Sequence, residues 1–117
     1  MNQTPVLIVG AGPVGLALAL GLARQNVTSI LFETKSEFDP HSRALGILPR
    51  TLEIFRSWGI YDNFISKGEF LTKVRVWVAR RPHPAFELDL SILKKITAID
   101  GILILPQNET ERVLLNA

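Results

Sequence analysis

The sequence predicts an α/β fold, and three observations near its start carry that prediction. Residues 5–10 form a short apolar run, rich in β-branched side chains, that ends in glycine, as is typical of a buried parallel strand. Strong helix formers follow over residues 13–25, and a second apolar run, Ser29 to Phe32, comes next. The order of strand, turn, helix and strand predicts one βαβ unit over residues 5–33.

The first strand and most of the helix lie in a segment without charge. Residues 1–23 carry no charged side chain, a feature that also invites a membrane interpretation. The segment lacks the basic start of a signal peptide, and Gly10, Gly12, Pro13 and Gly15 divide it into two apolar halves, each too short to span a bilayer. We therefore expect no membrane span.

Pro13 is expected to begin the helix. A proline suits the first helical position, where its missing N–H would have had no helical partner. The helix is expected to end near Gln25 and Asn26. Because its side chains are apolar on every side, we expect other elements to cover more than one of its faces.

The turn between the strand and the helix has the glycine spacing of a dinucleotide-binding loop. It reads Gly10-Ala11-Gly12-Pro13-Val14-Gly15. Gly10 permits the tight turn, Gly12 lets the backbone approach a pyrophosphate, and Gly15 lets helix and sheet pack closely. Backbone amides near Gly12, Val14 and Gly15, together with the positive end of the helix, can then hold two phosphates without a basic side chain.

Glu33 completes this pattern at the end of the second strand. It lies 33 − 10 = 23 positions after the first glycine, where an acidic side chain accepts hydrogen bonds from the adenosine ribose hydroxyls. A glutamate there would repel a ribose 2′-phosphate, which favours FAD or NAD over NADP. The sequence thus predicts a Rossmann-like dinucleotide-binding domain, and the spacing does not choose between FAD and NAD.

Residues 45–117 are expected to add helices, strands and a small β-hairpin region to this unit. Val74, Val76 and Val78 alternate with Arg75 and Trp77, as in a half-exposed strand. The expected elements are helices at Pro49–Trp58 and Asp62–Lys67, strands at Lys73–Ala79, Phe86–Leu90 and Gly101–Leu105, and a last helix from Pro106-Gln107 through Leu115.

Two local expectations accompany these elements. Trp58 is expected in the core rather than against a cofactor, because it extends the apolar stripe of its helix. Asn108 is expected to cap the last helix, with Glu111 three positions on as its partner in a capping box.

The composition is that of a soluble globular protein with one domain at most. The chain has 117 residues, 47% hydrophobic and 21% charged, which argues against a disordered tail. Its 13 basic and 11 acidic residues nearly balance, and the basic residues lack the interleaved aromatic side chains of a nucleic-acid surface. The absence of cysteine excludes a disulfide framework and a cysteine zinc site. We expect a cytoplasmic protein with no metal site and no nucleic-acid partner.

Across nearly its whole length the chain resembles the class A flavoprotein monooxygenases, the FAD-dependent aromatic hydroxylases of the para-hydroxybenzoate hydroxylase type. The order of several short motifs carries this resemblance. They are the Val9–Leu16 fingerprint, Glu33, the Ser42-Arg43-Ala44 run leading into Pro49-Arg50-Thr51-Leu52-Glu53, the helix end Trp58-Gly59-Ile60, and Pro106-Gln107 with Glu111.

The resemblance implies FAD as the cofactor and a set of residues that bind it. The residues implied for the ADP half are Gly10, Gly12, Pro13, Val14, Gly15 and Glu33. Arg43 would contact the central part of FAD, because its forked cation suits phosphate oxygens. Gln107 would contact the ribityl part, because its amide suits sugar hydroxyls. No general acid, base or nucleophile can be named.

The chain departs from the resembled family in length, and three functional interpretations stay open. Members run to several hundred residues and carry further FAD and nicotinamide motifs that are absent here. The chain is first interpreted as an incomplete FAD-binding N-terminal portion of an NAD(P)H-dependent monooxygenase that is inactive alone. The second interpretation is a non-catalytic nucleotide-binding or interaction module that pairs with itself or with a complementing chain. The third is a fragment of an NAD-binding dehydrogenase.

Overall fold

The computed structural model describes residues 5–41 and 46–117, and the chain divides into two compact units. The first unit is Met1–Ala44 with Pro106–Ala117, and the second is Leu45–Leu105. The contacts therefore group the last helix with the βαβ unit rather than with the segments that precede it in the chain.

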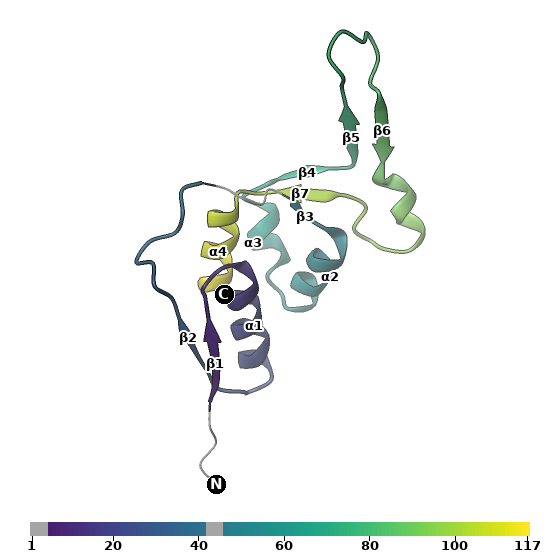
Figure 1. Cartoon of the computed structure of the whole chain (residues 1–117). Helices are drawn as coiled ribbons and strands as arrows, with labels where there is room; N and C mark the ends of the chain where they lie inside the picture. The colour runs from purple at the N-terminus through teal and green to yellow at the C-terminus, as the bar shows by residue number, and fades with distance from the viewer. Residues whose placement is uncertain (1–4, 42–45) are drawn as a thin grey trace. The chain divides into compact units, whose positions relative to one another are not determined.

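The elements are β1 (Val6–Val9), α1 (Pro13–Arg24), β2 (Ser29–Phe32), β3 (Gly46–Ile47), α2 (Pro49–Ser57), α3 (Tyr61–Ile65), β4 (Glu69–Leu71), β5 (Lys73–Val76), β6 (Phe86–Asp89), the 3-10 helix η1 (Leu90–Lys95), β7 (Ile102–Ile104) and α4 (Gln107–Leu115) (Figure 1).

The first unit contains the predicted βαβ arrangement. β1 and β2 pair in parallel, with Val6 opposite Ser29 and Val9 opposite Phe32. α1 begins at Pro13, as its sequence predicts, and ends at its cap residue Gln25. These elements confirm the α/β fold class with a Rossmann-like unit.

The predicted cover over α1 is present in part. α1 contacts β1, β2 and α4, and Leu16 is buried on its inner side. Val14 nevertheless keeps 82% of its surface exposed, and Val9 at the end of β1 keeps 88%. Within the described residues, the first unit therefore presents apolar surface that nothing covers.

The second unit has a small core between helices and an antiparallel sheet. The sheet has the order β3-β7-β4. Phe55 of α2 stacks on Phe64 of α3 with ring centroids 4.4 Å apart, and Leu103 of β7 is fully buried. Trp58 is half-buried, with its ring centroid 5.9 Å from that of Phe55. The short strands β3 and β4, and η1, are elements that the sequence pattern did not predict.

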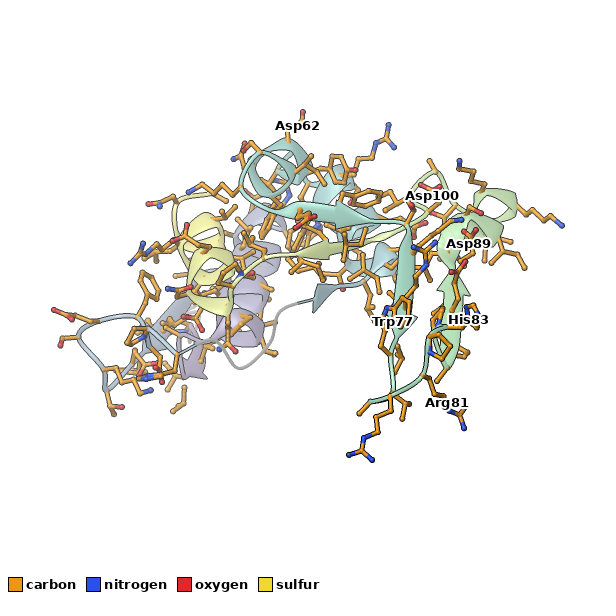
Figure 2. The ribbon with its side chains drawn as sticks, turned by 90° about the horizontal axis from the view of Figure 1, so that it is seen from above. Asp62, Trp77, Arg81, His83, Asp89 and Asp100 are labelled. Atoms are coloured by element: carbon orange, nitrogen blue, oxygen red, sulfur yellow. The ribbon has the colours of Figure 1, made fainter. Side chains whose placement is uncertain are left out.

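The predicted hairpin is formed by β5 and β6. The strands pair antiparallel, and ion pairs join Lys73 to Asp89 at 3.2 Å and Arg75 to Glu87 across them. β5 ends at Val76, three residues before the end of the predicted strand. In Figure 2, Asp89 lies at the end of β6 that is away from the turn, and Arg81 lies by the turn.

No helix within residues 5–41 and 46–117 has the length and apolar character needed to cross a bilayer.

Candidate functional site

The turn between β1 and α1 has the geometry that its glycines predict. Gly10 has φ +101°, a left-handed conformation that favours glycine, and its N–H donates to the Phe32 carbonyl at 2.7 Å. A Cβ added to Gly15 would lie 1.9 Å from the Gly10 carbonyl oxygen. The turn therefore lies directly against the first turn of α1, and a side chain at position 15 would force them apart.

The outer side of the same turn is open. A Cβ added to Gly12 would meet no heavy atom within 4 Å. Gly12 is the N-cap of α1, and no side chain caps the helix there. The amides at a helix N-terminus lack partners within the helix and carry partial positive charge, so this open end can receive an anion.

Glu33 is fixed beside the turn by three donors. Its Oε2 accepts a hydrogen bond from the Ala11 N–H at 2.8 Å. Its Oε1 accepts from the Lys35 N–H at 2.9 Å and from the Thr34 hydroxyl at 3.3 Å. These donors, the Lys35 N–H first and the Ala11 N–H second, lower the pKa of the Glu33 carboxyl. The side chain is thus an ionised acceptor at neutral pH.

A pocket of about 390 Å³ joins three segments of the first unit. Ala11 and Gly12 line it from the glycine turn, Glu33 and most of residues 35–41 from the loop after β2, and Gln107 from the start of α4. Gly12, Glu33 and Gln107, which are far apart in the sequence, therefore line one pocket.

The start of α4 differs from the predicted capping box. The N-cap is Pro106 and makes no side-chain cap, so the expected N-cap role of Asn108 is wrong. The helix starts at Gln107, one residue before Asn108, because Pro106 has a non-helical ψ of 143° and the next residue is the first with helical geometry. The buried Glu111 accepts a hydrogen bond from the Gln107 amide at 2.9 Å instead. This bond orients the Gln107 side chain on the pocket wall.

The loop after β2 is held by contacts that no sequence motif indicated. Asp39 accepts from the His41 N–H at 2.9 Å and pairs with the Lys35 ammonium at 3.3 Å. The backbone bond to His41, and then the bond from Lys35, lower the pKa of Asp39 to about 2. The Arg112 guanidinium of α4 lies 5.6 Å from the centroid of the Phe38 ring, a cation–π distance. Lys35, Phe38, Asp39 and His41 all line the pocket, so these contacts shape its wall.

The remaining site expectations are placed as follows. Pro13 and Val14 lie in the first turn of α1, and Val14 is exposed. Arg43 lies outside the described residues. No group of three or more His, Asp or Glu side chains within the described part of the chain is arranged to hold a metal ion.

The described residues fit the ADP half of a dinucleotide. An open backbone cradle at Gly12 and an uncapped helix end suit a pyrophosphate, and an ionised carboxylate suits ribose hydroxyls. Both features belong to the same pocket.

Comparison with known proteins agrees with this geometry. Residues 3–117 match a protein family described as FAD binding domain. A curated relative, the uncharacterized aromatic compound monooxygenase YhjG of Bacillus subtilis, is 36% identical over 114 residues, which cover 97% of this chain and 21% of the relative.

Solved structures of similar proteins share the fold of the chain. The p-nitrophenol 4-monooxygenase PnpA of Pseudomonas putida superposes with a TM-score of 0.85 at 26% identity, covering 96% of this chain and 28% of that structure. Aklavinone-11 hydroxylase, solved with FAD and aklavinone, gives a TM-score of 0.82 at 29% identity, covering 99% and 24%. The chain spans about a quarter of the length of these proteins.

Proposed function

The chain belongs to the family of FAD binding domains carried by class A flavin-dependent monooxygenases, and from this membership we propose that it binds FAD at the pocket beside the glycine turn. The observation that carries the proposal is the position of ionised Glu33 next to the open turn at Gly12. We propose that residues 1–117 bind FAD together, as a single, partial FAD-binding domain.

In this proposal the glycine turn and Glu33 bind the ADP half of FAD. The pyrophosphate is held by the N-terminus of α1 and by the amides of Gly12, Val14 and Gly15. Gly10 and Pro13 set the geometry of the turn. Glu33 accepts hydrogen bonds from the adenosine ribose hydroxyls.

Gln107 and Arg43 are proposed to bind the rest of the cofactor. Gln107 would contact the ribityl chain, and its bond to Glu111 fixes its orientation on the pocket wall. Arg43 is proposed for the central part of FAD on the basis of the resemblance of the Ser42-Arg43-Ala44 run to the family pattern.

We propose that the chain serves an NAD(P)H-dependent monooxygenase that hydroxylates an aromatic or related organic substrate. Its named relatives are monooxygenases. FAD, when bound, supplies the oxygen chemistry, and this chain's residues bind and orient it. The chain spans about a quarter of the proteins it matches, and we propose that it is inactive alone.

A titration of the chain with FAD, followed by flavin fluorescence with NAD as competitor, tests this function. We expect saturable binding that NAD does not displace. Glu33→Ala should weaken FAD affinity by about tenfold to 150-fold, because a hydrogen bond to a charged acceptor contributes roughly 1.5–3 kcal/mol. Glu69→Ala, the matched change in β4 of the second unit, should leave affinity unaltered. Absence of FAD binding by the folded chain would contradict the proposal.

The exposed apolar surface of the first unit favours a second function, association with another chain. β1 and β2 pair only with each other within the described residues, and Val9 is 88% exposed. Parallel strands are normally buried on both faces. We propose that a second copy or a complementing chain covers this surface.

Sedimentation across a concentration series tests that association. The chain should form concentration-dependent oligomers, and Leu7→Lys on β1 should reduce them, because Leu7 is 60% exposed. Ile92→Lys in the second unit, at 66% exposure, is the matched control. A monomer at all concentrations that also fails to bind a dye for apolar surface would contradict this second function.

A further inference from the structure

We propose that Glu33 is also a positioning residue that fastens the glycine turn to the loop after β2 before any nucleotide binds. A ribose then binds the same carboxylate and displaces its longest-bonded donor. The first statement concerns the nucleotide-free chain and stands independently, whereas the second rests on the proposed function.

The two oxygens of Glu33 bind different segments of the chain. Oε2 accepts from the N–H of Ala11, which lies in the turn between β1 and α1. Oε1 accepts from the N–H of Lys35 in the loop after β2. Ala11 and Glu33 are 22 positions apart in the sequence, and their bond extends the connection that the Gly10 N–H makes with the Phe32 carbonyl. One carboxylate thereby links both sides of the proposed ribose site.

The link is made by backbone donors rather than by a cation. The Lys35 ammonium pairs with Asp39 at 3.3 Å, while Glu33 takes the Lys35 backbone N–H. Backbone donors lie at fixed positions once the strands have paired, so they lose less conformational freedom on bonding than a flexible side chain does. We therefore expect the link to persist at high salt, unlike an exposed ion pair.

The acceptor capacity of the carboxylate limits what a ribose can add. A carboxylate has about four lone-pair sites. The Ala11 N–H, the Thr34 hydroxyl and the Lys35 N–H already form hydrogen bonds with Glu33, and the Thr34 N–H also faces the carboxylate and lowers its pKa. A ribose edge with two hydroxyls offers two more donors, which is at least one more than the capacity of the carboxylate allows. The Thr34 hydroxyl, at 3.3 Å, makes the longest of the three bonds. The geometry therefore assigns Thr34 as the donor that the ribose displaces.

Backbone amide exchange, measured by NMR on the nucleotide-free chain, tests the positioning role. Glu33→Ala should speed exchange at the Ala11 amide by about threefold to tenfold, because its acceptor is lost. The neighbouring Gly10 amide bonds to the Phe32 carbonyl at 2.7 Å and should exchange at an unaltered rate. Equal acceleration at Gly10 and Ala11 would mean that the whole turn opens, which would overturn the proposal. Unaltered exchange at Ala11 would also overturn it.

Two further variants keep the test decisive if Glu33→Ala does not fold. Glu33→Gln keeps the length of the side chain and one acceptor oxygen, so it should release either the Ala11 or the Lys35 amide and protect the other. Glu33→Asp keeps the charge but is one methylene shorter, so it should also fail to reach both. Glu69→Gln in β4 is the matched control and should alter neither amide. Full protection of both amides in Glu33→Gln and Glu33→Asp would overturn the proposal.

The ribose step is tested separately by FAD titration of Thr34→Val. If Thr34 is the displaced donor, this variant should bind FAD within about twofold of the parent chain, whereas Glu33→Ala binds more weakly. If Thr34→Val lost as much FAD affinity as Glu33→Ala, the proposed displacement of Thr34 would be overturned. If the chain bound no FAD but Ala11 exchange still depended on Glu33, the proposed function would fail while the positioning role stood.

Discussion

The β1–β2 pair and the β5–β6 hairpin are both two-stranded sheets, yet their side-chain hydrogen bonds are distributed in opposite ways. In the hairpin, the ion pairs of Lys73 with Asp89 and of Arg75 with Glu87 follow one another along the strands. At the β1–β2 pair, polar contacts gather at one end, where Glu33 bonds to the turn that leaves β1.

The difference follows from how the strands are connected. Antiparallel strands can be joined by a short turn, so cross-strand pairs can hold them together locally. Parallel strands need a crossover, which here is α1, and both strands then end at the same edge of the sheet. The crossover brings a glycine turn, a helix N-terminus and Glu33 together. The hairpin has no such convergence, so the connectivity of the strands explains why the proposed nucleotide site lies at the parallel pair.

The largest expected effect comes from Gly15→Ala. Its Cβ would lie 1.9 Å from the Gly10 carbonyl oxygen, so the backbone must move. We expect the free energy of unfolding to fall by about 3 kcal/mol, the upper range for overpacking, measured by urea denaturation. An unaltered midpoint would show that the turn and α1 are not in close contact.

Gly12→Ala should separate binding from stability at the same turn. The added methyl group meets nothing within 4 Å, and φ is −71°, so the unfolding free energy should change by less than about 1 kcal/mol. FAD affinity should fall by about tenfold or more, because the methyl group occupies the space through which the pyrophosphate approaches. Unaltered FAD affinity would move the phosphate site away from Gly12.

Low pH should distinguish the carboxylates of the two regions. The Ser91 hydroxyl and N–H and the Lys73 ammonium lower the pKa of Asp89 to about 2. Backbone donors lower the pKa of Glu33. A lowered folded-state pKa gives stability that is present above the unfolded value, 3.8 for Asp89 and 4.5 for Glu33, and is lost as pH falls through the folded value.

Carboxyl titrations by NMR should therefore give a midpoint near 2 for Asp89 and one below 4.5 for Glu33. Ser91→Ala should raise the pKa of Asp89, because it removes the largest cause of the shift. Thr34→Val should alter the pKa of Glu33 much less, because the larger causes there are backbone donors. Equal shifts in the two variants would contradict the contrast between the regions.

The smallest effect is expected in the hairpin. Both side chains of the Arg75–Glu87 pair are about half exposed, and such surface pairs contribute less than about 1 kcal/mol. Arg75→Ala should therefore lower the unfolding free energy by less than that amount and leave FAD binding unaltered. If Arg75→Ala lowered the unfolding free energy as much as Gly15→Ala, the hairpin would be held by its charges rather than by its backbone pairing.

Local chemistry explains which parts of the fold the sequence could predict. Pro13 and the glycine turn determine where α1 begins, so the βαβ unit was predicted almost to the residue. β3 and β4 have two and three residues, too few to show a hydrophobic period. The expected cap at Asn108 was wrong because Pro106 sets the start of α4.

The candidate site was predictable where it depends on side-chain type and spacing. The glycine motif and Glu33 could be identified because each residue type has a distinct chemical reason to be there. The bond from the Ala11 N–H to Glu33 could not, because any residue at position 11 except proline supplies the same donor. The contact between Phe38 and Arg112 joins distant segments and depends on tertiary packing alone.

The most direct test of the central claim is an FAD titration of the chain followed by backbone NMR. We predict that chemical-shift changes gather at residues 10–15, at Glu33 with the loop after it, and at the start of α4 near Gln107. The β5–β6 hairpin, residues 73–89, should show none. Saturable changes centred on the hairpin, or none at the glycine turn, would contradict the assignment of the nucleotide site to the parallel pair.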